Sequence, residues 1–248
     1  SFDNKIIYID SVRIENSNVV YYQRERISEI AIEQIKFNYD NSFLSKQFYL
    51  LGTDEFGRDI FSRIIFGARI SLFIGFCAVI ISLLLGLYLG FIAGYFGGFL
   101  NSILSRFTDM FLAFPAIFLM LLMLALFGNS LSTIILILGF SGWMSLFRIV
   151  RSEVISTKQK DYIISAKLLG FSKKYILIKE ILPVIMTPII VNLVFLFGNV
   201  ILAEASLSYL GLGTSMLYPS WGGMIESGQH YINNAWWMIF FPGFFLFI

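Results

Sequence analysis

Four long stretches without a charged residue constrain the fold of this chain more than any other feature. No Asp, Glu, Lys or Arg occurs in residues 70–105, 110–147, 181–203 or 227–248. A helix needs about 20 mostly apolar residues to cross membrane hydrocarbon, where only helices and closed barrels satisfy their own backbone polar groups. The stretches are continuously apolar rather than alternating, which favours helices over barrel strands. We therefore predict an all-α, polytopic membrane protein.

The composition agrees with this prediction. Of the 248 residues, 57% are apolar and 14% are charged, whereas soluble domains carry about 25% charged residues. Buried core helices of a soluble enzyme are the alternative, and the presence of several such stretches in one chain argues against it. The single cysteine, Cys77, lies in the first stretch. It has no partner for an internal disulfide, and we expect it to pack as a small apolar side chain.

The chain offers about five spans. We place them at residues 70–94, 104–127, 131–150, 184–204 and 235–248. Pro115 falls inside the second span, where a proline kinks a helix and frees a carbonyl group. The last span is still apolar where the sequence stops, so we expect the chain to be part of a longer one.

Three glycines recur at every fourth position of the first span: Gly86, Gly90 and Gly94. This spacing puts bare backbone on one face of a helix, where a second helix can approach closely. The sequence therefore predicts a helix–helix contact on this face, and an incidental excess of glycine is the alternative.

Residues 1–48 differ from the rest, because they are polar and carry β-type patches such as "KIIYI" and "NVVYY". We read them as a small water-facing segment, with a hairpin and then a helix in "RISEIAIEQIKF" at residues 26–37. In "LGTDEFGRDIFSRIIFGARISL", Thr53 or Asp54 is expected to cap an amphipathic helix that lies at the membrane interface.

The basic residues set the orientation. Residues 148–180 hold eight Lys or Arg and three Asp or Glu, a net charge of +5. Basic loops stay on the cytoplasmic side, so this loop is predicted to be cytoplasmic. The turn around "GYFGGFLNS" then lies on the same side, and residues 1–69 lie outside.

The basic loop contains "KDYIISAKLLGFSKKYILIKEILP", residues 160–183. Its first half suits a short helix that ends at Gly170, because glycine tolerates the left-handed conformation found after helix ends. Ser172 can cap a second helix that stops at Pro183. We therefore predict a helix–turn–helix on the cytoplasmic surface. A solvated basic turn would explain the lysines but not this pattern.

This order of features resembles the EAA loop of bacterial ABC-importer permeases, whose pattern is Glu-Ala-Ala, three residues, Gly, nine residues, Ile, one residue and Leu-Pro. Here Ile164, Ser165 and Ala166 occupy the first positions, and Gly170, Leu182 and Pro183 follow at the same intervals. Ile164, Ser165 and Glu180 depart from the pattern. The resemblance implies that this loop, residues 151–183, is the coupling helix that docks on a cytoplasmic ATPase. The residues implied in coupling are Ser165, Ala166, Leu168, Leu169, Gly170, Leu182 and Pro183.

Three further stretches are similar, in order, to the C-type permease subunit of dipeptide, oligopeptide and nickel ABC importers: "LGTDEFGRDIFSRIIFGARISL", "GYFGG…RFTDMFLAFPAIFL" and "ILAEASLSYLGLGTSMLYPSWGGMI". The likeness covers residues 49–248 and implies a type I importer transmembrane domain with six spans, one of them before this segment. It also implies a bacterial plasma membrane, a second permease subunit, two ATPase subunits and an external solute-binding protein. Residues 1–48 match no family pattern.

The resemblance implies that the chain is not itself an enzyme. No G-x-x-x-x-G-K-[ST] loop occurs in the sequence, so ATP and Mg²⁺ would be bound by the partner ATPases and this chain would need no cofactor. No nucleic-acid partner is expected. A pore-forming channel is one alternative, and it would need a polar stripe or a ring of charge along its pore. A membrane-embedded enzyme is another, and it would need clustered Asp, His or Ser–Lys groups at membrane depth.

Ionisable groups at membrane depth are candidates for the substrate pathway. Asp109 lies three residues after Arg106, so a local ion pair between them competes with a role in the pathway. Glu204 could line an outer vestibule, or it could satisfy backbone groups where the helix breaks. His230 is the only histidine, and no metal site is expected. Trp221, Trp236 and Trp237 fit an aromatic belt at the outer interface.

Overall fold

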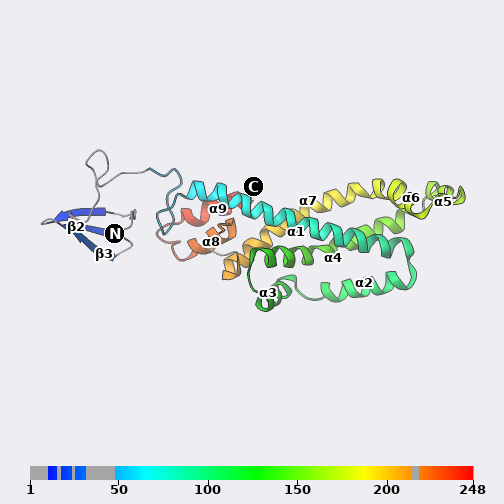
Figure 1. The fold of residues 1–248 in the computed structure, drawn as a ribbon, viewed down its shortest axis with the longest axis horizontal. Coiled ribbons are helices and arrows are strands. Elements are labelled where there is room, and N and C mark those ends of the chain that lie inside the picture. The colour runs from blue at the N-terminus through cyan, green and yellow to red at the C-terminus, as the bar shows by residue number, and fades with distance from the viewer. Residues whose placement is uncertain (1–10, 16–17, 24–25, 32–47, 214–217, 248) are drawn as a thin grey trace, which may run out of the picture.

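The computed structural model describes residues 11–15, 18–23, 26–31, 48–213 and 218–247. It consists of a small antiparallel sheet followed by an elongated bundle of helices, with the sheet at one end and α5 and α6 at the other (Figure 1). The helices are α1 (Ile60–Phe96), α2 (Gly98–Leu112), α3 (Ala116–Phe127), α4 (Leu131–Thr157), α5 (Asp161–Leu168), α6 (Lys173–Tyr175), the π-helix η2 (Ile176–Ile181), α7 (Leu182–Leu207), the π-helix η3 (Ser208–Leu212), α8 (Trp221–Gln229) and α9 (Trp237–Phe247).

The N-terminal sheet has the order β1-β2-β3, with β1 (Ser11–Glu15), β2 (Asn18–Gln23) and β3 (Arg26–Ala31). The β-type patch "NVVYY" forms β2 as predicted, while "KIIYI" lies outside the described residues. The helix predicted from residue 26 is wrong over β3, which pairs with β2 from Gln23↔Arg26 to Asn18↔Ala31. A neighbouring strand rich in β-branched and aromatic residues offers a ladder of hydrogen bonds, and this pairing outweighs the local preference for a helix.

Three helical stretches are long and apolar enough to cross a membrane: α1, α4 and the stretch from Lys173 to Leu212. α2 and α3 together would make a fourth span, although the path of the chain bends by 86° at the break between them. Pro115 lies at this break, as predicted, but the chain turns there far more sharply than a kink. The fifth predicted span corresponds to α9, which has only 11 described residues.

The glycine face of α1 packs against α4, which confirms the predicted contact. A Cβ atom added at Gly86, Gly90 or Gly94 would lie 2.9, 2.7 or 2.8 Å from the Cβ atom of Leu146, Val150 or Val154. Nearby, the Ser82 hydroxyl donates to the Gly139 carbonyl over 2.7 Å. Since side chains other than hydrogen do not fit, the two backbones approach as closely as helices can.

The predicted interfacial helix is not separate from the first span, because α1 runs unbroken from Ile60 to Phe96. Its cap is Asp59, whose carboxyl accepts from the amides of Phe61 and Ser62, and neither Thr53 nor Asp54 caps it. Asp54 instead stabilises the loop before α1. Its carboxyl accepts a hydrogen bond from the Arg58 amide over 2.9 Å and forms a salt bridge with Arg63 over 3.2 Å.

The end of the bundle opposite the tip of α5 and α6 is built from the start of α1, α8 and α9. Trp221 is buried there: its amide donates to Ser71 and its indole N–H to the Ile64 carbonyl, both over 3.1 Å. It is therefore part of the core and not of an aromatic belt. Trp237 donates to the Thr53 carbonyl. Trp236 is exposed, and its place in an aromatic belt stays a prediction.

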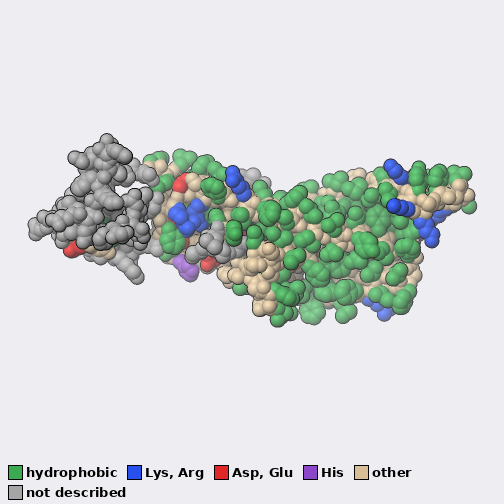
Figure 2. All heavy atoms as spheres, viewed as in Figure 1, with side chains coloured by type: hydrophobic (Ala, Val, Ile, Leu, Met, Phe, Trp, Pro, Cys, Tyr) green, Lys and Arg blue, Asp and Glu red, His purple; other side chains and the backbone are tan. Residues whose placement is uncertain are grey.

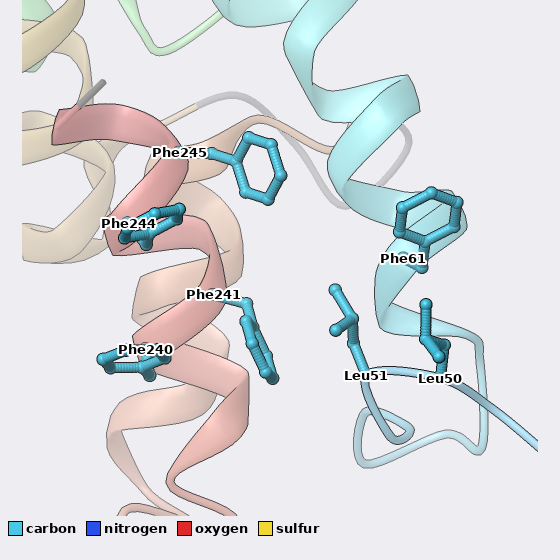
Figure 3. A pocket seen from close by; sticks show the side chains of 7 residues that line it. All are labelled: Leu50, Leu51, Phe61, Phe240, Phe241, Phe244 and Phe245. Carbon is cyan, nitrogen blue, oxygen red and sulfur yellow. The ribbon is translucent and has the colours of Figure 1, made fainter.

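An apolar cavity of about 350 Å³ lies between α9 and the loop before α1. Leu50, Leu51 and Phe61 line one side, and phenylalanines of α9 line the other (Figure 3). All the residues that line it are leucine or phenylalanine, so the cavity is as apolar as a membrane interior and offers no group for catalysis or for binding a polar ligand.

Candidate functional site

The candidate site is the tip of the bundle, residues 161–175, which comprises α5, its connecting turn and α6. The turn has the hydrogen bonds of a Schellman motif, in which the Phe171 amide donates to the Ala166 carbonyl over 3.2 Å and the Gly170 amide to the Lys167 carbonyl over 3.1 Å. Gly170 has φ +82°, as the motif requires. Ser172 then caps α6 by accepting from the Tyr175 amide over 3.2 Å. The predicted helix–turn–helix is confirmed.

The inner face of the tip anchors it to the bundle. Ile163 and Ala166 are buried, and they belong to an apolar cluster with Val154 of α4 and with Ile176 and Ile181 of η2. The resemblance implied that Ala166 takes part in coupling, and this role stays a prediction. The structure places Ala166 inside the chain, because the i, i+3 spacing from Ile163 turns both side chains toward η2 and α4.

The outer face of the tip is apolar and uncovered. Leu168 is 84% exposed and Leu169 is 77% exposed. Phe171 is also exposed and stacks on Tyr175 with ring centroids 4.8 Å apart. Phe171 was missed in the sequence, although an apolar residue directly after the glycine is a frequent companion of the Schellman motif. Apolar side chains that project from the end of a rigid turn are suited to enter a groove on another protein.

Lysines surround this apolar surface, and Figure 2 shows basic side chains gathered at this end of the bundle. Lys160, Lys167, Lys173, Lys174 and Lys179 are all exposed. Salt bridges in the described residues lie elsewhere, at Asp54 and Asp109. The surface therefore has an apolar centre with basic residues around it. Such a surface would complement an apolar groove with an acidic rim.

Pro183 does not end the second helix, contrary to the prediction. The helix continues through η2 into α7, and the Leu182 amide donates to the Leu177 carbonyl, five residues earlier. A proline cannot donate and collides with the carbonyl four residues before it. The wider turn of the π-helix relieves this conflict, so Leu182 and Pro183 join the tip to a membrane-spanning helix without a break.

Asp109 pairs with Arg148 of α4 over 2.6 Å, and no contact with Arg106 is among the described ion pairs. The sequence spacing suggested Arg106, but α4 brings a guanidinium to the same place from 39 residues away. One turn further along α4, Arg151 donates to Asn101. These contacts tie α2 to α4 near the cytoplasmic end predicted from the charges, and both members of the Asp109 pair are more than half exposed.

Glu204 is buried near the C-terminal end of α7. Its Oε1 atom accepts from the Ser208 hydroxyl over 2.8 Å, and the residue is 1% exposed. A residue that lines an open vestibule would be accessible, so this arrangement favours the second alternative, in which Glu204 satisfies groups where the helix breaks. The groups are serine hydroxyls rather than the backbone. His230 follows α8, and no cluster of metal-binding side chains occurs in the described part of the chain.

These features define a class: a helical, multi-pass membrane protein whose exposed basic tip is formed by a short helix–turn–helix between two spans. The chain belongs to the family of binding-protein-dependent transport system inner membrane components, whose pattern matches residues 86–248.

Named relatives agree with this assignment. The dipeptide transport system permease protein DppC of Alkalihalophilus pseudofirmus is 42% identical over 78% of this chain and 64% of its own length. DppC of Bacillus subtilis is 41% identical over 79% of the chain and 61% of its length, and the oligopeptide permease OppC of the same organism is 38% identical over 79% and 64%. The chain thus spans less than two thirds of these relatives.

Solved structures show the same fold. Two inward-facing forms of the MetNI methionine ABC transporter align with TM-scores of 0.65 and 0.62, at 16% identity. The alignments cover 76% and 75% of this chain, and 89% and 94% of the transporter chains. The predicted importer transmembrane fold is confirmed by this likeness.

The conformation of Gly170 leads to a testable expectation. A Cβ atom at this position would meet no other atom within 4 Å, so a substitution is opposed by backbone strain alone. Gly170→Ala should destabilise the tip by about 1 kcal/mol and leave membrane insertion unchanged. Proteolysis of the tip in the purified protein measures this, and Gly170→Asn should be milder because asparagine tolerates positive φ. Equal cleavage of all three proteins would contradict the role of the turn.

Proposed function

We propose that this chain is a permease subunit of an ATP-driven importer in the plasma membrane of a bacterium, and that it forms half of a pathway for dipeptides or oligopeptides. The partners are a second permease subunit, two cytoplasmic ATPase subunits that bind ATP and Mg²⁺, and an external solute-binding protein. The names of the relatives at 38–42% identity support peptides as the cargo.

The observation that carries the proposal is the tip. Its outer face exposes Leu168, Leu169 and Phe171, while its inner face is fixed to α4 and η2 by Ile163 and Ala166. A push on the outer face is therefore passed to two membrane-spanning helices at once. Apolar side chains on a short helix are suited to a groove, and an ATPase that moves on binding ATP would displace them.

The test is peptide uptake by the complete system. The full-length protein is reconstituted in proteoliposomes with the second permease, the two ATPases and the binding protein, and labelled dipeptide and pentapeptide are supplied outside. We expect accumulation that depends on ATP and on the binding protein. Uptake down a gradient without ATP would contradict the proposal and support a channel.

The orientation makes a separate prediction. Lys173 begins α6 and His230 follows α8, and these two helices lie toward opposite ends of the bundle (Figure 1). Both residues are exposed. In a Cys77→Ala background, Lys173→Cys should react with a membrane-impermeant maleimide only after the cytoplasmic side is opened. His230→Cys should react in intact cells. The reversed result would overturn the orientation, and reaction of both from one side would overturn the number of crossings.

A further inference from the structure

The Glu204 cluster, which consists of Glu204, Ser208 and Ser220, is a buried polar group that the proposed mechanism has not yet used. All three side chains are at most 2% exposed. Ser208 donates to Oε1 of the carboxyl over 2.8 Å, and the Ser220 hydroxyl also interacts with the carboxyl. Among the described residues, Oε2 has no hydrogen-bond partner. Burial of a carboxyl group without a full set of hydrogen bonds costs free energy. We therefore ask which function this burial serves.

Of these contacts, the one to Ser220 joins α8 to the end of α7, because Ser208 lies one turn beyond Glu204 in the same helical path. Ser220 precedes α8 and caps it, because its hydroxyl accepts from the Gly223 amide over 3.1 Å. Between them, Gly222 lies so near α7 that an added Cβ atom would be 2.5 Å from the Cα atom of Ala205. The start of α8 is thus held at the level of Glu204 by side-chain hydrogen bonds and by close backbone contact.

The same α7 leads to the tip. The helical path runs without interruption from Lys173, through η2, to the end of α7 at Leu207. At a rise of about 1.5 Å per residue, this path is about 50 Å long. It begins within the tip and ends beside the Glu204 cluster, so one helix connects the two ends of the bundle (Figure 1).

We propose that Glu204 is a positioning residue that fixes α8 to the outer end of this helix, so that a displacement of the tip also moves α8. The proposal rests on the proposed function, because it needs a partner that moves the tip. Without the carboxyl, α7 would still move, but the start of α8 would be free to lag behind. ATP would then be hydrolysed without a matching change at the outer side.

The chemistry of the cluster selects the substitutions. The contact needs an acceptor at the place of Oε1, which glutamine retains and leucine does not. Glu204→Gln should therefore behave almost as the native protein does, while Glu204→Leu should lose the contact at a similar volume. Ser220→Gly removes the hydroxyl on the α8 side and leaves the carboxyl, and glycine is tolerated at a helix N-cap. Ser206→Ala is the matched control, because Ser206 is exposed and donates to the Leu202 carbonyl of its own helix.

The experiment measures ATP hydrolysed per peptide imported in the reconstituted complete system. Glu204→Leu should raise this ratio about five-fold or more, Ser220→Gly should raise it less, and Glu204→Gln and Ser206→Ala should leave it unchanged. Spin labels at Ser132 of α4 and at His230, in a Cys77→Ala background, report the motion. Their separation should change on ATP binding in the native protein and stay constant in Glu204→Leu.

A native ratio and a native label movement in Glu204→Leu would overturn the positioning role. If that variant does not assemble, Ser220→Gly decides, and native coupling in Ser220→Gly would overturn the proposal equally. Loss of coupling in Glu204→Gln as well would show that charge rather than position matters and would also overturn it. Failure of the native complex to import any peptide would instead contradict the proposed function.

Discussion

Replacement of Gly90 by leucine should separate α1 from α4 and destabilise the protein by at least about 3 kcal/mol. Overpacking of a well-packed interior typically costs 1–3 kcal/mol, and this site is less forgiving than most. The added Cβ atom would lie 2.7 Å from the Cβ atom of Val150 and 3.1 Å from the carbonyl oxygen of Phe147. A backbone atom cannot rotate away, so the whole helix must move.

Thermal unfolding of the purified full-length protein in detergent measures the effect, together with the amount of complex recovered. Gly198→Leu is the matched control, because Gly198 lies within α7 and an added Cβ atom there would meet nothing within 4 Å. We expect it to keep the native melting temperature. A native melting temperature for Gly90→Leu would show that α1 and α4 do not depend on this contact.

The second large effect is expected at the tip, where Leu168→Asp combined with Leu169→Asp should detach the ATPase. A fully buried leucine contributes about 1.5–3 kcal/mol, and two of them correspond to a loss of about 100-fold or more in affinity. The chain itself should fold normally, because both side chains are exposed and neither belongs to the buried cluster of Ile163 and Ala166.

Retention of the ATPase during purification and ATP-dependent uptake are the two measurements. Gln159→Asp adds a negative charge to an exposed position just before the tip, and it should keep both activities, which separates loss of apolar contact from a change in charge. Leu168→Met with Leu169→Met should also be active. Full retention of the ATPase by the double aspartate variant would show that the partner binds elsewhere.

Ala166→Arg would not be a clean test of attachment at the tip. Ala166 is buried against its own chain, so an arginine would disrupt the inner face of the tip as well as any attachment. It cannot distinguish a binding defect from a folding defect. The exposed leucines can.

Much of the fold was predictable because a membrane makes local rules strict. The charge-free stretches predicted α1, α4 and α7. The glycines at every fourth residue of α1 predicted a close helix–helix contact, which α4 makes. The limits of these rules lie where contacts are distant in sequence. Arg148 reaches Asp109 only because α4 folds back along α2, and Trp221 becomes buried only because Ser71 and Ile64 of α1 meet it there.

The candidate site shows the same division. Gly170 and Ser172 fix the turn through local hydrogen bonds, and these were predictable from residue type. Which face of α5 points inward depends on its contacts with α4 before it and η2 after it, so the burial of Ala166 was not predictable from residue type. The helix continues past Pro183 because of the π-helix η2, and no residue type in this segment predicts a π-helix.

The contact between α1 and α4 also limits how this molecule can change shape. Backbones in contact along Gly86, Gly90 and Gly94 cannot slide without a clash, because each glycine faces a branched side chain of α4. Lys158 adds a bond from the end of α4 to the Gly94 carbonyl over 2.8 Å. We therefore expect α1 and α4 to move together as one rigid body. We expect motion instead in α2 and α3, which are joined to the pair through residues with positive φ: the chain leaves α1 through Gly97 and Gly98 and reaches α4 after Gly128.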